Sequence, residues 1–166
     1  GPFSNVPLRW GLTGTIPKEQ HEFFGIRAGL GQVINKLSAH ELQEEGVLAE
    51  CNIDVIQMQD TAEFPNYQSE LSYLVTDQKR LNYISGLIDE MSKNGNTLVL
   101  VDRIKCGDKL QELLPNATFV KGAMKSADRK DTYTEINEST NMVVIATYGV
   151  AAVGINIPRI FNLVLI

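Results

Sequence analysis

Short, continuous apolar runs alternate with longer amphipathic segments in the second half of the chain. Four runs are too short for helices and are typical of buried parallel strands: Thr97–Val101, Ala117–Val120, Met142–Ala146 and Leu163–Ile166. Since polar or amphipathic stretches separate them, the pattern predicts a doubly wound α/β domain with a mainly parallel sheet.

Three helices are predicted, one before the first of these strands and two between them. The first spans Asp77–Lys93 with apolar residues at helical spacing, and Thr76 is its expected N-cap. The other two are Arg103–Leu114, which Pro115 ends, and a polar helix that begins after Ser126.

The first third of the chain has weaker signals. Pro7–Thr15 predicts a strand that leads into a tight turn, and Ala49–Met58 predicts the first strand of the domain. Between them, Ser38 and Glu41 have the spacing of a capping box, which predicts a short helix that ends at Gly46. Residues 59–67 are expected to form a loop.

Composition narrows the functional classes. The 166 residues, 43% of them hydrophobic, suffice for one domain with a real core. A net charge of −5 argues against a general nucleic-acid coat protein, although it permits DNA contact through a narrow groove.

The spacing of Cys51 and Cys106 predicts free thiols and no zinc site. Without a long apolar run or a leader, no membrane partner and a cytoplasmic location are expected.

The clearest candidate for chemistry follows the third strand. Thr147 stands at its carboxyl end, and small residues including Gly149, Gly154 and Asn156 connect it to the last strand. Ligands of open parallel sheets bind at this end of the strands, where a hydroxyl and glycine amides suit a phosphate. An ordinary strand, loop and strand accounts for the same residues equally well.

The same stretch resembles a known motif. ATYGVAAVGINIP, residues 146–158, is similar to the fifth conserved motif of superfamily 2 helicases. GLTGT at Gly11–Thr15 resembles the third motif, and TLVLVD at Thr97–Asp102 resembles the strand of the fourth. The likeness covers nearly the whole chain. It is strongest to phage branch-migration helicases of the UvsW type and weaker to XPB-type repair helicases.

The resemblance implies a fold and a division of the chain. The fold would be a RecA-like three-layer domain of the P-loop NTPase type, the second motor domain of a helicase. Residues 1–17 would be the tail of an absent first motor domain, 18–50 the interdomain linker, and 51–166 the second domain, incomplete at its C-terminal end.

It also implies roles for individual residues. Thr147 would contact a backbone phosphate of the DNA strand that the motor tracks. Gly154 and Asn156 would face the nucleotide, with Asn156 where many members carry Asp. Lys121 and Gly122 would approach the nucleic-acid backbone, since glycine has no Cβ to hold it away.

Two further matches to helicase motifs are less specific about the role of their residues. Thr13, Gly14 and Thr15 match the motif that couples ATP hydrolysis to movement. Asp102 would lie near the interdomain cleft or the DNA channel, or would simply cap the following helix. Near Lys121, further basic residues are interspersed with acidic ones, so an ordinary solvated face is equally plausible: Lys125, Arg129 and Lys130 with Asp128 and Asp131.

The missing motifs limit the expected activity. The chain has no G-x-x-x-x-G-K-[ST] sequence to hold ATP phosphates, and Asp89-Glu90 lies inside a predicted helix. The arginine-rich sixth motif is also absent. We therefore expect ATP and Mg²⁺ to bind only in the intact enzyme, and this chain alone neither to hydrolyse ATP nor to unwind DNA.

Other functions fit part of the pattern. Asp102 and Thr147 could be the phosphoacceptor and switch hydroxyl of a receiver-like domain, but the acidic pair and lysine of such a site are not in place. A non-catalytic adaptor that binds DNA or a partner is another possibility. The apolar strand at Pro7–Thr15 also suggests packing against the absent first motor domain or a homodimer.

Overall fold

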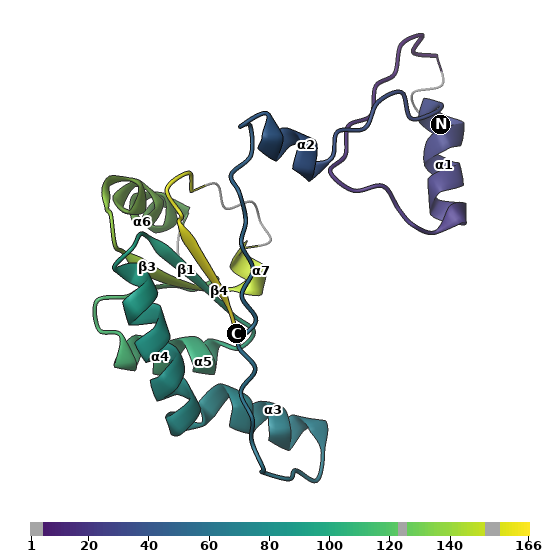
Figure 1. Ribbon diagram of the computed structural model, residues 1–166. Coiled ribbons are helices and arrows are strands. Elements are labelled where there is room, and N and C mark those ends of the chain that lie inside the picture. The colour runs from purple at the N-terminus through teal and green to yellow at the C-terminus, as the bar shows by residue number, and fades with distance from the viewer. Residues whose placement is uncertain (1–4, 123–125, 152–156) are drawn as a thin grey trace. The chain divides into compact units, whose positions relative to one another are not determined.

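The computed structural model describes residues 5–122, 126–151 and 157–166, without the side chains of 126–130 and 133. The chain divides into two compact units, Gly1–Gln59 and Asp60–Ile166, which are described separately (Figure 1).

The second unit contains a four-stranded, wholly parallel sheet. Its strands are β1 (Thr97–Val101), β2 (Thr118–Val120), β3 (Val143–Thr147) and β4 (Asn162–Leu165), in the order β2-β3-β1-β4. All four predicted strands are confirmed, with ends shifted by at most one residue. Because β1 and β3 are central, their residues are buried on both faces, which explains why these runs are continuously apolar.

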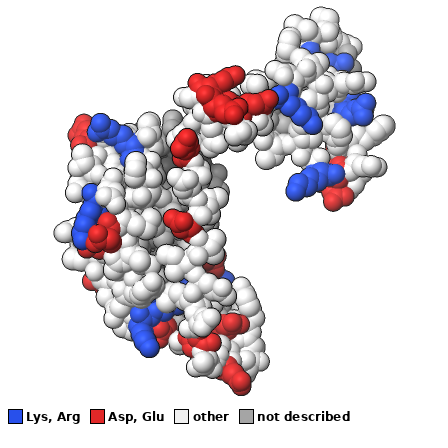
Figure 2. All heavy atoms as spheres, in the orientation of Figure 1, with Lys and Arg blue, Asp and Glu red and all other residues white. Residues whose placement is uncertain are grey.

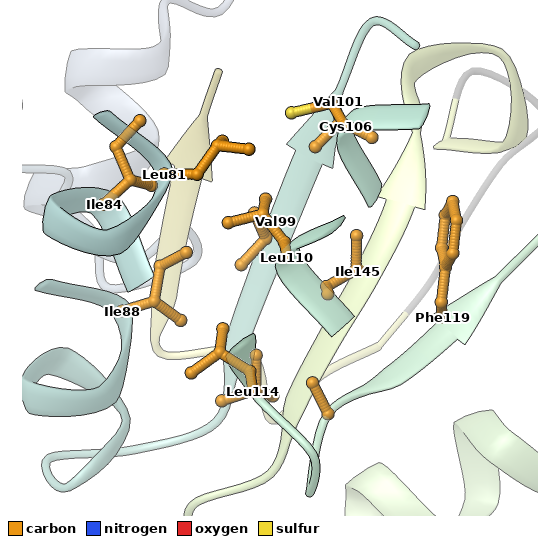
Figure 3. Packing of buried hydrophobic residues seen from close by; sticks show 12 residues of the cluster. Leu81, Ile84, Ile88, Val99, Val101, Cys106, Leu110, Leu114, Phe119 and Ile145 are labelled. Atoms are coloured by element: carbon orange, nitrogen blue, oxygen red, sulfur yellow. The ribbon is translucent and has the colours of Figure 1, made fainter. Parts of the chain in front are cut away.

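Helices cover both faces of the sheet. They are α4 (Gln78–Ser92) and α5 (Ile104–Leu113) on one face, and α6 (Ser126–Glu138) and α7 (Tyr148–Ala151) on the other, while α3 (Tyr67–Thr76) packs on α4 and α5. On one face α4 and α5 contribute Leu81, Ile88 and Leu110, which are fully buried against Val99 and Ile145 (Figure 3). Burying each of these side chains stabilises the fold by about 1.5 to 3 kcal/mol.

The opposite face has its own core. Ile136 of α6 and Val150 of α7 pack there against Leu98, Val120 and Val144 of the sheet. Adjacent strand residues such as Phe119 and Val120 belong to different cores, as the alternation of side chains along a strand requires. The predicted three-layer α/β architecture is therefore confirmed.

Asn96 ties the amino-terminal edge of the sheet together. Its buried amide nitrogen donates to the carbonyl oxygens of Ile136 and Ser139, at 2.8 and 2.9 Å. Its amide oxygen accepts from the backbone N–H of Met142 at 2.9 Å. One side chain thus joins the end of α6 to the starts of β1 and β3.

Two helices lie in the first unit, α1 (Gln20–Leu30) and α2 (Ala39–Glu44). The predicted capping box of α2 is confirmed: the Ser38 hydroxyl accepts from the Glu41 backbone N–H at 3.1 Å, and the Glu41 carboxylate accepts from the Ser38 N–H at 2.7 Å. Gly46 follows with a φ of 71°, the left-handed conformation expected beyond a helix end.

Two strand predictions in this unit are wrong. Pro7–Thr15 and Ala49–Met58 have the composition of strands, but they form no sheet ladder among the described residues. Leu12 and Val55 are 98% and 87% exposed. A β-rich composition favours a strand only where a neighbouring strand accepts its hydrogen bonds, and neither segment has one here.

The start of the second unit also differs from the prediction. Residues 67–76 form α3, a helix that was not predicted from the sequence, and Asn66 caps it by accepting from the Ser69 N–H at 2.9 Å. The N-cap of α4 is Asp77, which accepts from the Arg80 N–H at 2.7 Å, and not Thr76. Thr76 belongs to α3, where its hydroxyl donates to the Ser72 carbonyl.

Candidate functional site at the carboxyl edge of the sheet

The parallel register brings three of the predicted site residues to one edge of the sheet. Val101, the last residue of β1, pairs with Thr147, the last residue of β3. Val120, the last residue of β2, pairs with Ala146. Asp102 and Lys121 follow directly on their strands, so both stand beside Thr147 at the carboxyl edge.

Alternation along the strands divides these side chains between the two faces. Phe119 and Ile145 point to the face that α4 and α5 cover. Lys121 and Thr147 lie two residues further along the same chains and therefore belong to that face. Asp102 follows Val101, which also points to that face, and so belongs to the opposite one. Lys121 and Thr147 are consequently the pair placed to act on one ligand.

The Lys121 ammonium is held by groups on two neighbouring elements. Its Nζ lies 2.6 Å from Oδ1 of Asp108 on α5, and 5.0 Å from the centre of the Phe119 ring. Both charged side chains stay a little under half exposed, at 43% for Lys121 and 45% for Asp108. The cation is therefore oriented and still reachable from solvent.

Asp102 makes an ion pair with its neighbour and does not cap α5. Its Oδ2 lies 2.9 Å from Nε of Arg103. Arg103 occupies the N-cap position of α5 and makes no capping hydrogen bond with its side chain. The capping interpretation of Asp102 is therefore wrong, and its paired side chain stays more than half exposed.

Gly122 follows Lys121 in a turn and is exposed. A Cβ added there would meet Val150 at 3.8 Å, which is ordinary van der Waals contact. The described packing of the protein thus leaves room for a side chain. A close approach of a ligand remains a reason for glycine at this position.

The remaining predicted site residues lie elsewhere. Thr13, Gly14 and Thr15 form a turn in the first unit, in which the Thr13 hydroxyl donates to the Thr15 carbonyl at 2.7 Å and accepts from the Thr15 N–H at 3.2 Å. Gly154 and Asn156 lie outside the described residues, as does Lys125, and the side chains of Arg129 and Lys130 are also not described.

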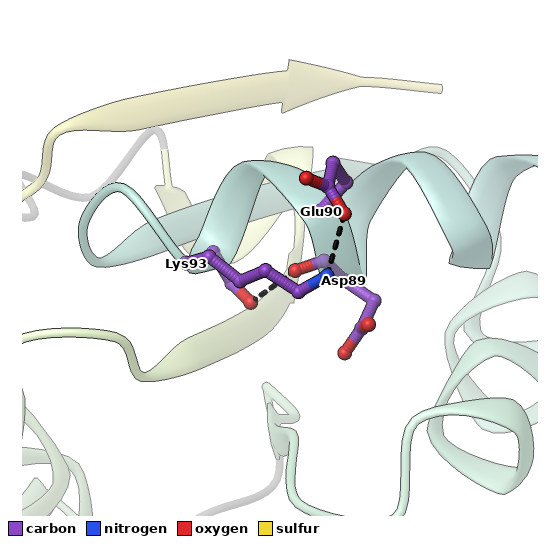
Figure 4. Close-up of polar contacts among 4 residues, drawn as sticks. Asp89, Glu90 and Lys93 are labelled. Atoms are coloured by element: carbon purple, nitrogen blue, oxygen red, sulfur yellow. Dashed lines mark hydrogen bonds and ion pairs between the residues drawn. The ribbon is translucent and has the colours of Figure 1, made fainter.

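An open groove lies at the opposite, amino-terminal edge of the sheet, between α4 and the turn before β2. Its volume is about 440 Å³, and its lining includes Ser85, Asp89 and Asn116. Asp89 and Glu90 lie inside a helix, α4, as predicted. Both are exposed, and Glu90 is paired to Lys93 at 2.5 Å (Figure 4). This pairing raises the pKa of the Lys93 ammonium. The groove contains none of the predicted site residues.

The surface charge and the possible metal ligands of the second unit also bear on which ligands the protein can bind. On the face seen in Figure 2, basic and acidic side chains of the second unit lie next to one another. Within the described part of the chain, no three His, Cys, Asp or Glu side chains gather into a group that could hold a metal.

Cys51 is exposed and Cys106 is buried, both as free thiols, and burial raises the pKa of Cys106. No helix of the described residues is long and apolar enough to cross a membrane.

Comparison with known protein families shows the family to which this chain belongs. Residues 79–166, more than half of the chain, match the helicase conserved C-terminal domain. The chain belongs to this helicase family. The match begins in α4 and includes the whole parallel sheet together with Thr147, so the carboxyl edge is part of the helicase domain itself.

A phage helicase is similar to this chain in sequence and in structure. The chain is 22% identical to the ATP-dependent DNA helicase uvsW of Enterobacteria phage T4 in an alignment that covers 98% of this chain and 34% of the phage protein. It therefore spans about a third of that relative. The crystal structure of T4 UvsW matches 60% of this chain and 21% of the UvsW chain, with a TM-score of 0.54 and 23% identity, which supports the RecA-like fold.

Two residues of the site were not foreseen from the sequence. Asp108 and Arg103 supply the ionic partners of Lys121 and Asp102. Arg103 is adjacent to its partner and could have been noticed. Asp108 is thirteen residues from Lys121, and only the crossing of α5 over β2 brings the two together.

Proposed function

We propose that this chain is the second motor domain of an ATP-dependent DNA helicase, and that the carboxyl edge of its sheet contacts the nucleic-acid backbone. Thr147 and Lys121 would bind phosphates, Gly122 would let the backbone approach, and Asp102 would lie near the DNA channel from the opposite face of the same edge. The observation that supports the proposal is the register: β2 and β3 end together, with Lys121 and Thr147 on one face of the carboxyl edge of a helicase family domain.

The chemistry of these residues suits phosphate. A threonine hydroxyl and a lysine ammonium are typical donors to phosphate oxygens, and such contacts position a protein on nucleic acid without reading its sequence. Lys121 remains partly exposed, so an incoming phosphate can reach it. The net charge of −5 means that binding depends on these local groups and not on a basic surface.

The ATP-dependent step would require groups that this sequence does not contain. The chain has no glycine-rich sequence ending in Lys and Ser or Thr, so ATP and Mg²⁺ would be bound mainly by the first motor domain. Gly154 and Asn156 would complete the nucleotide site from this side. We infer that the isolated chain hydrolyses no ATP. We also infer that the intact enzyme remodels branched DNA, as the likeness to phage helicases suggests.

The first unit would provide the coupling and docking elements. Thr13, Gly14 and Thr15 would link hydrolysis to movement through their turn. Trp10 and Leu12 are 70% and 98% exposed, which suits packing against the first motor domain or a second copy of this chain.

Binding of labelled DNA tests the proposed interface. The anisotropy of a fluorescein-labelled single-stranded oligonucleotide is followed as the chain is added, with Thr147→Val as the variant. This change removes the hydroxyl and keeps the shape, so we expect binding about three- to tenfold weaker. Thr140→Val is the matched control, because Thr140 is an exposed threonine that precedes β3 at the opposite edge. Equal binding by the Thr147 variant and the unchanged chain would refute the proposal.

A further inference from the structure

The first cation after the end of β1 and the first after the end of β2 are already paired with carboxylates. Arg103 is paired with Asp102, and Lys121 with Asp108. A phosphate that approaches Lys121 therefore meets a site whose charge is compensated. This inference rests on the proposed function, because it concerns how the same edge binds nucleic acid.

Asp108 is the partner with the more specific geometry. It comes from α5 and reaches Lys121 across the face of β2, whereas Asp102 pairs with its own neighbour in sequence. The Phe119 ring lies against one side of the Lys121 ammonium, and the Asp108 carboxylate contacts the ammonium as a polar partner. Since the 2.6 Å ion pair is a little under half exposed, water and ligands can compete for it.

We propose that Asp108 competes with nucleic-acid phosphate for Lys121 and thereby weakens the grip of the carboxyl edge on DNA. In the free protein the carboxylate holds the ammonium. A phosphate must displace that carboxylate, and the two like charges repel each other. A motor that steps along DNA must release each phosphate, and an internal competitor makes the contact reversible.

Removing the charge of Asp108 tests this directly. Asp108→Asn keeps an oxygen that can accept from Lys121 but removes the competing charge. We expect single-stranded DNA to bind about three- to fivefold more tightly at low salt. The slope of log affinity against log salt concentration should become steeper by about 0.7, because no displaced carboxylate then takes up a cation to offset the counterion released from the phosphate.

A matched control separates this effect from net charge. Asp89→Asn changes the charge of the protein by the same amount, but Asp89 lies in the groove at the amino-terminal edge. We expect this variant to bind DNA like the unchanged chain. Circular dichroism establishes that each variant is folded. Asp108→Ala, which removes the whole carboxylate, should also bind DNA more tightly.

The double variant establishes that Lys121 transmits the effect. Lys121→Gln should weaken binding, and adding Asp108→Asn to it should give no further change. The inference is overturned if Asp108→Asn behaves like Asp89→Asn, or if its gain persists without Lys121. If neither the unchanged chain nor Asp108→Asn binds DNA at low salt, both the proposed interface and this inference fail. Binding by the unchanged chain with no gain in Asp108→Asn refutes the inference alone.

Discussion

The ring of Phe119 occupies the space that a side chain at Gly107 would need. A Cβ built on Gly107 would lie 2.3 Å from Cζ of Phe119 and within 2.8 Å of two further ring atoms. Glycine at this position therefore allows α5 to approach β2, and the same contact places Asp108 near Lys121.

Gly107→Ala should destabilise the protein although alanine is the better helix former. We expect a loss of about 1 to 3 kcal/mol in the free energy of unfolding, because the buried ring must move. Urea denaturation followed by circular dichroism measures this. Gly86→Ala is the control: Gly86 also lies within a helix, but an added Cβ meets no atom within 4 Å, so a gain of about 0.4 to 1 kcal/mol is expected. Equal stabilities of the two variants would contradict the packing described here.

Asn96→Ala should be among the most destabilising changes to a polar residue. It leaves a partly buried N–H and two carbonyl oxygens without their present partner, so the expected loss is on the order of 3 kcal/mol. Thermal unfolding measures the stability of this variant and of the control Asn94→Ala. The Asn94 side chain is exposed and lies two residues before Asn96. That control should change stability by less than about 0.5 kcal/mol. A similarly small change in Asn96→Ala would show that the hydrogen bonds of the Asn96 side chain are not needed for stability.

Gly122→Ala should separate binding from folding. Because the nearest atom would lie 3.8 Å from the new Cβ, we expect stability within about 0.5 kcal/mol of the unchanged chain. The methyl group should hold a nucleic-acid backbone away and weaken DNA binding about three- to tenfold. Anisotropy titration measures the affinity, with Gly86→Ala as the control. Unchanged affinity would remove Gly122 from the interface.

The pH dependence of the loop before α3 follows from one hydrogen bond. The Tyr73 hydroxyl donates to Oδ2 of Asp60 at 2.5 Å, which lowers the pKa of Asp60 and raises the pKa of Tyr73 to about 12. The Asp60 contribution to local stability is present above its ordinary pKa and is lost as pH falls through the lowered value. The Tyr73 contribution is present below about pH 10 and is lost as pH rises through about 12.

Spectrophotometric titration of tyrosine tests this pair. The difference between the unchanged chain and Tyr73→Phe should show a phenol that ionises near pH 12. Asp60→Asn should bring that ionisation back toward the ordinary tyrosine value. A Tyr73 phenol that ionises near 10 in the unchanged chain would contradict the hydrogen bond.

The sheet could be predicted because burial on both faces leaves a simple signal. Thr97–Val101 is apolar at nearly every position, and its observed limits agree with the prediction. The capping box at Ser38 and Glu41 is similarly local, and the structure contains it. Such features depend on the residues themselves and on their immediate neighbours.

The errors concern features that depend on distant partners. Ala49–Met58 has the composition of a strand, but a ladder needs another segment, which composition cannot supply. α3 was missed because its helix has no buried residue and so gives little periodic signal. Part of the candidate site could be predicted, because the ends of parallel strands meet at one edge. Asp108 could not, since only tertiary packing places it beside Lys121.

The ATPase activity of the protein encoded by the whole open reading frame tests the central claim most directly. We expect single-stranded DNA to stimulate ATP hydrolysis. In Thr147→Val, half-maximal stimulation should require about three- to tenfold more DNA, with the basal rate unchanged. Thr140→Val should behave like the unchanged protein. An ATPase that DNA does not stimulate, or one that responds equally with and without the Thr147 hydroxyl, would contradict a nucleic-acid contact at this edge of the sheet.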